Sequence, residues 1–293
     1  MNLLETLMHR PLLCDGATGT QLQTMGLPPG MGGERWNLEH PERIRELHAR
    51  YRRAGADLLT TNTFGGTRLV LMNHGLDAQV HEINRRAAEL AREIAGEKAF
   101  VLGDVGPFGG ILEPYGEVVP EKAAELFREQ IDALLEGGAD AILVETMSDP
   151  NEAAIAVRIA REMGAPAVIA TFAFQHSAVG FRTMMGASAA MAVEVALEAG
   201  ADIVGANCGT ELSLDDYVML TQELAAAAGG MPVIAQPNAG SPVLVDGRIS
   251  YRESAAEFAA AAPRLLAAGA KIVGGCCGST PEHIAAIAAG FPR

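Results

Sequence analysis

Short apolar runs recur along the chain, and most of them follow a glycine. Four of these joints share the sequence Gly-Ala followed by Asp or Lys, at 55–57, 138–140, 200–202 and 269–271. Glycine at such a point supplies the left-handed cap that ends a helix, and the apolar run after it is short enough for a buried parallel strand. The pattern therefore predicts a repeated helix-to-strand joint.

Weaker joints of the same kind occur at three further places, before the apolar runs 100–102, 167–169 and 232–234. Their glycines are Gly96, Gly164 and the pair Gly229 and Gly230. Together with an opening strand at 11–15, these joints predict eight strands that alternate with helices, which is the count of an α/β fold of the (β/α)₈ TIM barrel type. A doubly wound open sheet is the alternative, because periodicity does not show closure.

Helix starts agree with this register. Asp149-Pro150 and Thr280-Pro281 each place a capping side chain before a proline that suits the first helical position. The alanine-rich stretches 225–228 and 255–268 are typical of outer helices, since alanine is a strong helix former. No low-complexity linker divides the chain, so we expect one barrel domain over 1–293.

The composition narrows the classes of partner. Hydrophobic residues make up 49% of the chain and the formal net charge is -14, so the lysines and arginines that neutralise phosphates are outnumbered. We expect no nucleic-acid partner and no membrane partner, since no run approaches the roughly 20 apolar residues that cross a bilayer. The segment 1–13 lacks the features of a secretory signal, which predicts a cytoplasmic protein.

Three of the four cysteines lie where two predicted strands end. Cys208 follows the apolar run 203–206, and Cys276 and Cys277 follow the run 271–274. Thiolates bind Zn²⁺ well, and three of them with one open position are typical of a catalytic site. The alternative is that these cysteines are small buried hydrophobes, and the spacing alone does not decide. We expect Cys14 to be a core residue.

The position of these cysteines in a barrel favours a shared site. Active sites of such barrels are built at the carboxyl-terminal ends of the strands, and strands six and eight are neighbours but one. Adjacent cysteines can both serve one metal only where the chain leaves the sheet, and Gly275 and Gly278 permit that bend. A redox disulfide prefers a Cys-x-x-Cys turn, which is absent.

The motifs at these strand ends resemble those of the homocysteine S-methyltransferase family. That family includes betaine-homocysteine methyltransferases and the amino-terminal module of cobalamin-dependent methionine synthase. The resemblance runs through nearly the whole chain and rests on the motifs at 15–20, 55–57, 61–64, 144–146, 207–209, 237–240 and 274–278. It implies a (β/α)₈ barrel that methylates homocysteine and binds zinc.

The resemblance also implies roles for single residues. Cys208, Cys276 and Cys277 are expected to bind Zn²⁺, with the sulfur of homocysteine in the fourth position. Five further residues are implied to contact the substrate or approach the metal: Asp15, Gly16, Thr61, Glu145 and Asn238.

Each of these five residues has an ordinary structural interpretation as well. Glu145 matches the carboxylate that receives the amino group of homocysteine, but it can equally be a structural acid at the barrel rim. Asp15, Gly16 and Thr61 match positions that hold the amino-acid end, although Asp-Gly is also a common turn. Asn238 matches a residue that fills the metal site without substrate, and Asn-Ala-Gly is also a turn sequence.

The chemistry that follows from the metal is methyl transfer to sulfur. A free thiol has a pKa of about 8.5, so a small fraction is thiolate at neutral pH, whereas coordination to Zn²⁺ deprotonates it outright. The zinc therefore generates and positions the nucleophile. Attack on an electrophilic methyl group then gives methionine.

The motifs do not identify the methyl donor. The cofactor modules of methionine synthase do not occur within 1–293, so we expect a methylated corrinoid (methylcobalamin) on a separate protein. The alternative is a small molecule such as betaine or S-methylmethionine. Trp36, in the loop 28–37, can stack on a cationic donor or can anchor the loop.

Two other functions fit the sequence less well. A lyase that forms a Schiff base needs a lysine at a strand end, and Lys98, Lys122 and Lys271 lie elsewhere. A protein that stores or senses metal does not need a substrate shell. Five histidines show no metal-ligand spacing and are expected to face solvent or cap helices: His48, His74, His81, His176 and His283.

Overall fold

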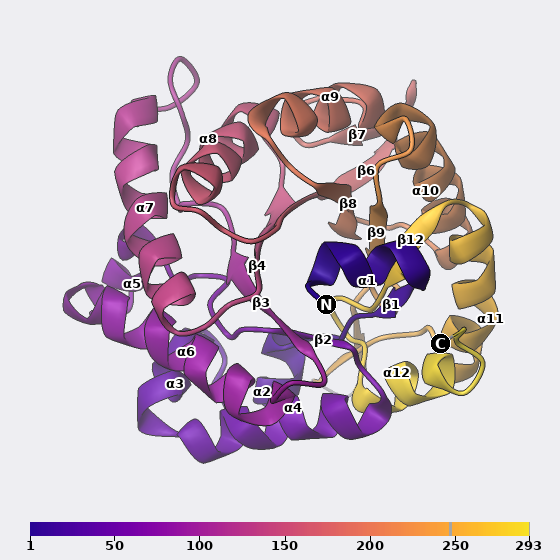
Figure 1. Ribbon diagram of the computed structural model, residues 1–293, viewed down its shortest axis with the longest axis horizontal. Coiled ribbons are helices and arrows are strands. Elements are labelled where there is room, and N and C mark those ends of the chain that lie inside the picture. The colour runs from indigo at the N-terminus through magenta and orange to yellow at the C-terminus, as the bar shows by residue number, and fades with distance from the viewer. Residues whose placement is uncertain (246–247, 293) are drawn as a thin grey trace.

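Eight parallel strands form the sheet of the computed structural model, which describes residues 1–245 and 248–292 (Figure 1). In their order around the sheet they are β1 (Leu12–Leu13), β12 (Ala270–Val273), β9 (Val233–Pro237), β8 (Ile203–Cys208), β5 (Val168–Phe172), β4 (Ala141–Met147), β3 (Phe100–Val105) and β2 (Leu58–Thr60). The predicted domain extends to Arg293, which lies outside the described residues.

Backbone contacts join the two ends of this order. Cys14 and Leu58 form a parallel bridge, and the N–H of Asp57 donates to the carbonyl oxygen of Leu13 at 2.7 Å. The strands β1 and β2 are therefore neighbours, and the sheet is a barrel rather than a doubly wound open sheet. The prediction of a (β/α)₈ barrel is confirmed.

Helices surround the barrel, as Figure 1 shows. The longer outer helices are α4 (Pro41–Ala54), α6 (Val80–Ala95), α7 (Pro120–Glu136), α8 (Pro150–Glu162), α9 (Ala189–Ala199), α10 (Leu214–Ala228), α11 (Ala255–Ala267) and α12 (Pro281–Ala288). Short turns of helix lie in the loops after β1 and β2: α2 (Gly19–Thr24), η1 (Gly33–Arg35), α3 (Trp36–Glu39), α5 (Arg68–Met72) and η2 (Asp77–Gln79).

The predicted joints are all present. Their glycines have φ between 54° and 113°, a region that side-chain-bearing residues rarely adopt: Gly55, Gly96, Gly138, Gly164, Gly200, Gly230 and Gly269. The side chains of Asp149 and Thr280 cap α8 and α12, each with a proline at the start of the helix. The helix-to-strand pattern therefore predicted the local backbone as well as the order of elements.

The aspartate of the repeated joint fixes the register of neighbouring strands. Each carboxylate accepts the backbone N–H of the strand beside it: Asp57 from Leu13 (3.0 Å), Asp140 from Val101 (2.7 Å) and Asp202 from Val168 (2.8 Å). Each carboxylate also pairs with an arginine: Arg10, Arg92 and Arg161 respectively. At the fourth joint Lys271 is exposed, and there the register between β12 and β9 shifts.

A helix that the sequence pattern did not predict closes one end of the barrel. In α1 (Leu3–His9), Leu3 and Leu7 pack on a buried cluster at the amino-terminal ends of the strands, which includes Leu58 and Ile203. In Figure 1 this helix crosses the end of the barrel that faces the viewer. Because α1 fills the amino-terminal end, a site in the barrel must open at the carboxyl-terminal end.

Two antiparallel hairpins extend from the carboxyl-terminal end of the barrel, and neither was predicted. The first is formed by β6 (Phe174–Ser177) and β7 (Gly180–Thr183), which follow β5. The second is formed by β10 (Val243–Val245) and β11 (Arg248–Ser250), which follow β9. These hairpins add length to the loops that surround a site at this end.

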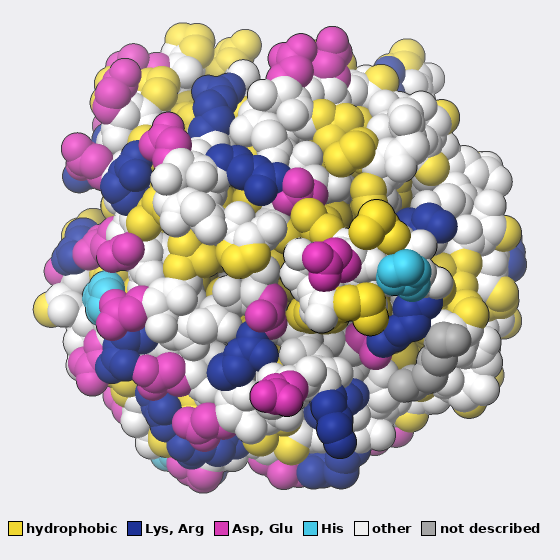
Figure 2. Space-filling view, in the orientation of Figure 1, with side chains coloured by type: hydrophobic (Ala, Val, Ile, Leu, Met, Phe, Trp, Pro, Cys, Tyr) yellow, Lys and Arg dark blue, Asp and Glu magenta, His cyan; other side chains and the backbone are white. Residues whose placement is uncertain are grey.

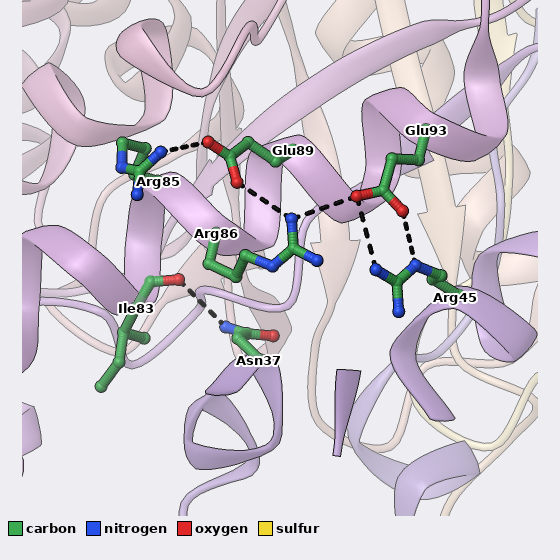
Figure 3. A network of polar contacts seen from close by, with 7 residues as sticks. All are labelled: Asn37, Arg45, Ile83, Arg85, Arg86, Glu89 and Glu93. Carbon is green, nitrogen blue, oxygen red and sulfur yellow. Dashed lines mark hydrogen bonds and ion pairs between the residues drawn. The ribbon is translucent and has the colours of Figure 1, made fainter. Parts of the chain in front are cut away.

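Charged side chains on the outer surface are interspersed and partly paired. In Figure 2 acidic and basic side chains alternate over the face that carries α1. Figure 3 shows one network between α4 and α6, in which Arg86 pairs with Glu89 (3.0 Å) and Glu93 (3.1 Å), and Arg45 pairs with Glu93 (2.5 Å). Such exposed pairs contribute little each, about 0 to 1 kcal/mol. Within the described residues, no helix combines the length and apolarity that a membrane span requires.

Candidate functional site

The three predicted cysteines converge at the carboxyl-terminal end of the barrel. Cys208 ends β8, Cys276 and Cys277 follow β12, and β9 lies between these strands. Their Sγ atoms lie within 4.8 Å of one another, and all are free thiols. Sulfur atoms around a tetrahedral Zn²⁺ lie about 3.8 Å apart, given Zn–S bonds of about 2.3 Å, so small side-chain shifts suffice for this trio to hold the ion.

The backbone around the cysteines is unusual and well fixed. Cys208 has φ 55°, which is rare for a residue with a side chain. The N–H of Cys276 donates to the carbonyl oxygen of Pro237 at 2.8 Å, so the chain stays attached to β9 after it leaves the sheet. Gly278 has φ 80°, and a Cβ there would lie 2.1 Å from the Tyr251 ring. This turn therefore requires glycine and lets two adjacent cysteines face one point.

The sulfur atoms share protons among themselves. Hydrogen bonds from Cys276 and Cys277 lower the pKa of Cys208 to about 3, whereas hydrogen bonds with Cys208 and Cys277 raise the pKa of Cys276. Hydrogen bonding to Cys208 and burial raise the pKa of Cys277 to about 12. One thiolate thus accepts from two thiols, and a bound divalent cation would displace the two remaining protons.

Asn238 brings an amide to the edge of the sulfur cluster. Its Nδ2 donates to the Gly209 carbonyl oxygen at 3.0 Å and to Cys208 Sγ at 3.7 Å. Its Oδ1 is buried and has no hydrogen-bond partner among the described residues. A buried acceptor without a partner is costly, so an amide oxygen here fits a neighbouring cation. Asn238 therefore lies beside the sulfur cluster, and its approach to a metal stays a prediction.

Asn207, which precedes Cys208, connects the sulfur cluster to a carboxylate. Its Nδ2 lies 3.8 Å from Cys276 Sγ and donates to Glu145 Oε2 at 3.1 Å. Its Oδ1 accepts from the N–H of Thr146 at 2.9 Å and from Thr171 Oγ1 at 2.8 Å. Thr146 has φ 58°, so Asn207 stabilises a second left-handed residue beside the site.

Glu145 is a half-buried acid next to the cysteines, and the buried acid Asp104 lies on the neighbouring strand β3. Burial, followed by the charges of Cys208 and Asp15, raises the pKa of Glu145 to about 8. Burial and the charge of Glu145 raise the pKa of Asp104 well above its usual range. Asp104 is paired with Leu143, two residues before Glu145, so the side chains of Asp104 and Glu145 lie on the same face of the sheet. The site therefore combines soft sulfur ligands with a region that favours a positively charged group.

Asp15 lies on the same side of the barrel and is anchored to the next strand. Its Oδ2 accepts from the N–H of Thr60, and its Oδ1 accepts from Thr60 Oγ1, both at 2.8 Å. Burial raises the pKa of Asp15 to about 7 despite these bonds. Asp15 thus has a structural role between β1 and β2, and its charge acts on Glu145 and Asp104.

Gly16 and Thr61, the other two predicted substrate residues, are packed tightly. A Cβ on Gly16 would lie 2.6 Å from Ser279 Oγ and 2.9 Å from the Tyr51 hydroxyl oxygen. The hydroxyl of Thr61 accepts from the N–H of Asp104 at 2.9 Å and is 2.6 Å from Thr63 Oγ1. Direct contact of Gly16 or Thr61 with a substrate stays a prediction.

The structure decides the role of Trp36, which the sequence left open, agrees with the expectations for Cys14 and His283, and corrects the expectation for His48. Trp36 anchors its loop: it is 3% exposed, and the Arg43 guanidinium lies 4.7 Å from its ring centroid. Cys14 is fully buried in the core, as expected. The prediction for His48 was wrong, because it lies on the buried face of α4, and neither ring nitrogen is hydrogen-bonded to a described residue. Burial lowers its pKa to about 4. His283 caps α12, as predicted.

Sequence reasoning missed Asn207, Asp104 and Tyr217 as site residues. Asn207 and Asp104 were visible as polar residues in apolar strands, but their partners come from other strands. The Tyr217 hydroxyl donates to the Cys208 carbonyl oxygen from α10, a contact that no local pattern indicates.

Comparisons with known proteins agree with this geometry. The family model described as homocysteine S-methyltransferase matches residues 12–291. Methionine synthases of Mycobacterium leprae and Mycobacterium tuberculosis are 34% and 33% identical over 100% and 98% of the chain, which spans about a quarter (25%) of their length. The metallated form of the homocysteine methyltransferase MmuM from Escherichia coli superposes with a TM-score of 0.81 at 27% identity, over 98% of this chain and 99% of that one.

Proposed function

Since the chain belongs to the homocysteine S-methyltransferase family, we propose that it transfers a methyl group to the sulfur of homocysteine, giving methionine, with Zn²⁺ held by Cys208, Cys276 and Cys277. The observation that carries the proposal is the approach of three Sγ atoms to within 4.8 Å at the carboxyl-terminal end of the barrel. When bound, Zn²⁺ keeps a coordinated thiol deprotonated at neutral pH.

Different residues around the cysteines bind different groups of homocysteine. Glu145 is half-buried beside the sulfur cluster and is suited to receive the substrate ammonium group. Asp15 adds negative charge from the β1 side, while Gly16 and Thr61 line the same strand ends. Asn238 contributes an unpartnered amide oxygen close to Cys208, which suits the fourth position before homocysteine binds. In the transfer, the sulfur of homocysteine forms a bond to the methyl carbon as the bond from that carbon to the donor breaks.

For the donor we propose a methylated corrinoid supplied by another protein or domain. The support is the 34% and 33% identity to proteins named methionine synthase. The burial of Trp36 under Arg43 removes the aromatic receptor that a betaine or sulfonium donor would have used in this loop. A small-molecule donor is the second candidate, because the match to the Escherichia coli enzyme covers 99% of that chain.

A donor panel tests the proposal. Zinc-loaded protein is incubated with homocysteine and methylcobalamin, betaine or S-methylmethionine, and methionine is quantified. We expect methionine from methylcobalamin. If only betaine or S-methylmethionine gives methionine, the donor is a small molecule and homocysteine is still the acceptor. If no donor gives methionine, the whole proposal is contradicted.

Asn207→Ala is predicted to weaken zinc binding by the cysteines and the positioning of Glu145 together. The variant removes the amide that lies between Cys276 Sγ and Glu145, and loss of such an outer-shell partner typically costs about 10- to 100-fold in metal affinity or activity. Chelator competition measures zinc affinity, and methionine formation measures activity. Thr171→Val is the matched control, since it removes one hydrogen bond to Asn207 Oδ1 and leaves the amide donor in place. Equal effects of the two variants would contradict the prediction.

A further inference from the structure

Asp104 is held rigidly by its backbone at the end of β3. Its N–H donates to Thr61 Oγ1 at 2.9 Å, and its carbonyl oxygen accepts from Thr63 Oγ1 at 2.7 Å and from Gln130 Nε2 at 3.2 Å. Contacts from the loop after β2 and from α7 thus fix the main chain. None of these bonds uses the carboxyl group of Asp104.

The side chain itself lacks a protein partner that balances its charge. Asp104 is 3% exposed, and its Oδ1 is buried without a hydrogen bond within residues 1–245 and 248–292. The charges that act on it come from Glu145, Glu34 and Asp15, all acidic. A buried carboxylate is costly unless it is paired, so this group fits a ligand that brings a positive charge.

The groups around Asp104 indicate that the positively charged group of this ligand is an ammonium group. Glu145 lies on the same face of the sheet as Asp104, on the neighbouring strand β4, and is linked through Asn207 to the cysteine cluster. A second acceptor, Gln236 Oε1, is buried near the end of β9 without a partner in the part of the chain that the structure describes. An ammonium group has three donors and no acceptor, so it can satisfy Glu145 and Asp104 together. A water molecule on Asp104 is the competing explanation, and it predicts no selectivity.

We propose that Asp104 is a specificity-determining residue that binds the α-ammonium group of the substrate together with Glu145. The site then selects an α-amino thiol over a thiol acid of the same length without the amino group. The inference rests on the proposed function, since it takes homocysteine as the substrate. It assigns to Asp104 a role that the sequence motifs did not indicate.

The experiment compares two ligands on the zinc-loaded full chain. L-homocysteine and 4-mercaptobutanoate differ in the α-amino group, and their dissociation constants are measured by calorimetry for wild type and Asp104→Asn. We expect Asp104→Asn to raise the dissociation constant of homocysteine about tenfold or more and to change that of 4-mercaptobutanoate less than about twofold. Loss of one charged partner of the ammonium group costs at least about 1.4 kcal/mol, which corresponds to a tenfold change in affinity. Zinc content, measured alongside, should stay at the wild-type level.

Two further variants keep the test decisive. Glu152→Gln is the matched control: Glu152 is also a buried acid with its pKa raised to about 7 by burial, but it accepts from the N–H of Phe108. It should leave the ratio of the two dissociation constants unchanged. If Asp104→Asn does not fold, Asp104→Ser replaces it with the same expectation.

The outcomes separate this inference from the function on which it rests. An unchanged ratio in Asp104→Asn, or equal weakening of both ligands, would overturn the role of Asp104 while zinc-dependent binding of homocysteine by the wild type stands. Failure of the wild type to bind homocysteine with zinc present would overturn the proposed function and this inference with it.

Discussion

Replacing Cys276 with alanine is expected to release the metal and reduce methionine formation to the background level. Cys276 supplies one of three sulfur atoms that lie within 4.8 Å of one another, and no other described cysteine, histidine or acid belongs to this group. Loss of a direct ligand should exceed the roughly 10- to 100-fold effect of losing an outer-shell partner. Zinc content by mass spectrometry and methionine formation measure the two effects.

Cys14→Ala is the matched control for this variant. Cys14 is the remaining cysteine, fully buried in the barrel core and outside the sulfur group. Its replacement should leave zinc content and methionine formation near the wild-type values. Full zinc content and wild-type turnover in Cys276→Ala would refute the assignment of the ligands.

Gly205→Ala is expected to destabilise the barrel strongly. Gly205 is paired with Ile234 across β8 and β9, and a Cβ on Gly205 would lie 1.9 Å from the Ile234 carbonyl oxygen and 2.6 Å from its Cγ2. Backbone atoms in the middle of a barrel cannot move aside cheaply. We expect the free energy of unfolding to fall by about 3 kcal/mol or more, at or above the upper end for overpacked cores.

The fraction of folded protein as a function of urea concentration gives the free energy of unfolding. Gly19→Ala is the control. Gly19 begins α2, and a Cβ there meets nothing within 4 Å. Alanine is a better helix former than glycine, so stability should be unchanged or rise by up to about 1 kcal/mol. If Gly205→Ala unfolds at the wild-type urea concentration, β8 and β9 do not pack as described.

Much of the site was predictable because of how parallel strands assemble. Their carboxyl ends meet at one end of the barrel, so cysteines after the sixth and eighth strands had to share a rim once closure was assumed. Asp104 and Asn207 lay on the same rim but were not identified. Their significance depends on which polar atoms lack partners, and that information exists only when neighbouring strands are placed.

The sequence by itself determined the alternation of elements, the left-handed glycine at each joint and the cysteines at the strand ends. These features follow from local sterics and from hydrophobic periodicity, which a single chain segment carries. Tertiary structure alone decided that the sheet closes through Cys14 and Leu58, that α1 fills one end, and that His48 and Trp36 are buried. The reason is that closure, burial and the pairing of polar atoms depend on contacts between residues far apart in sequence.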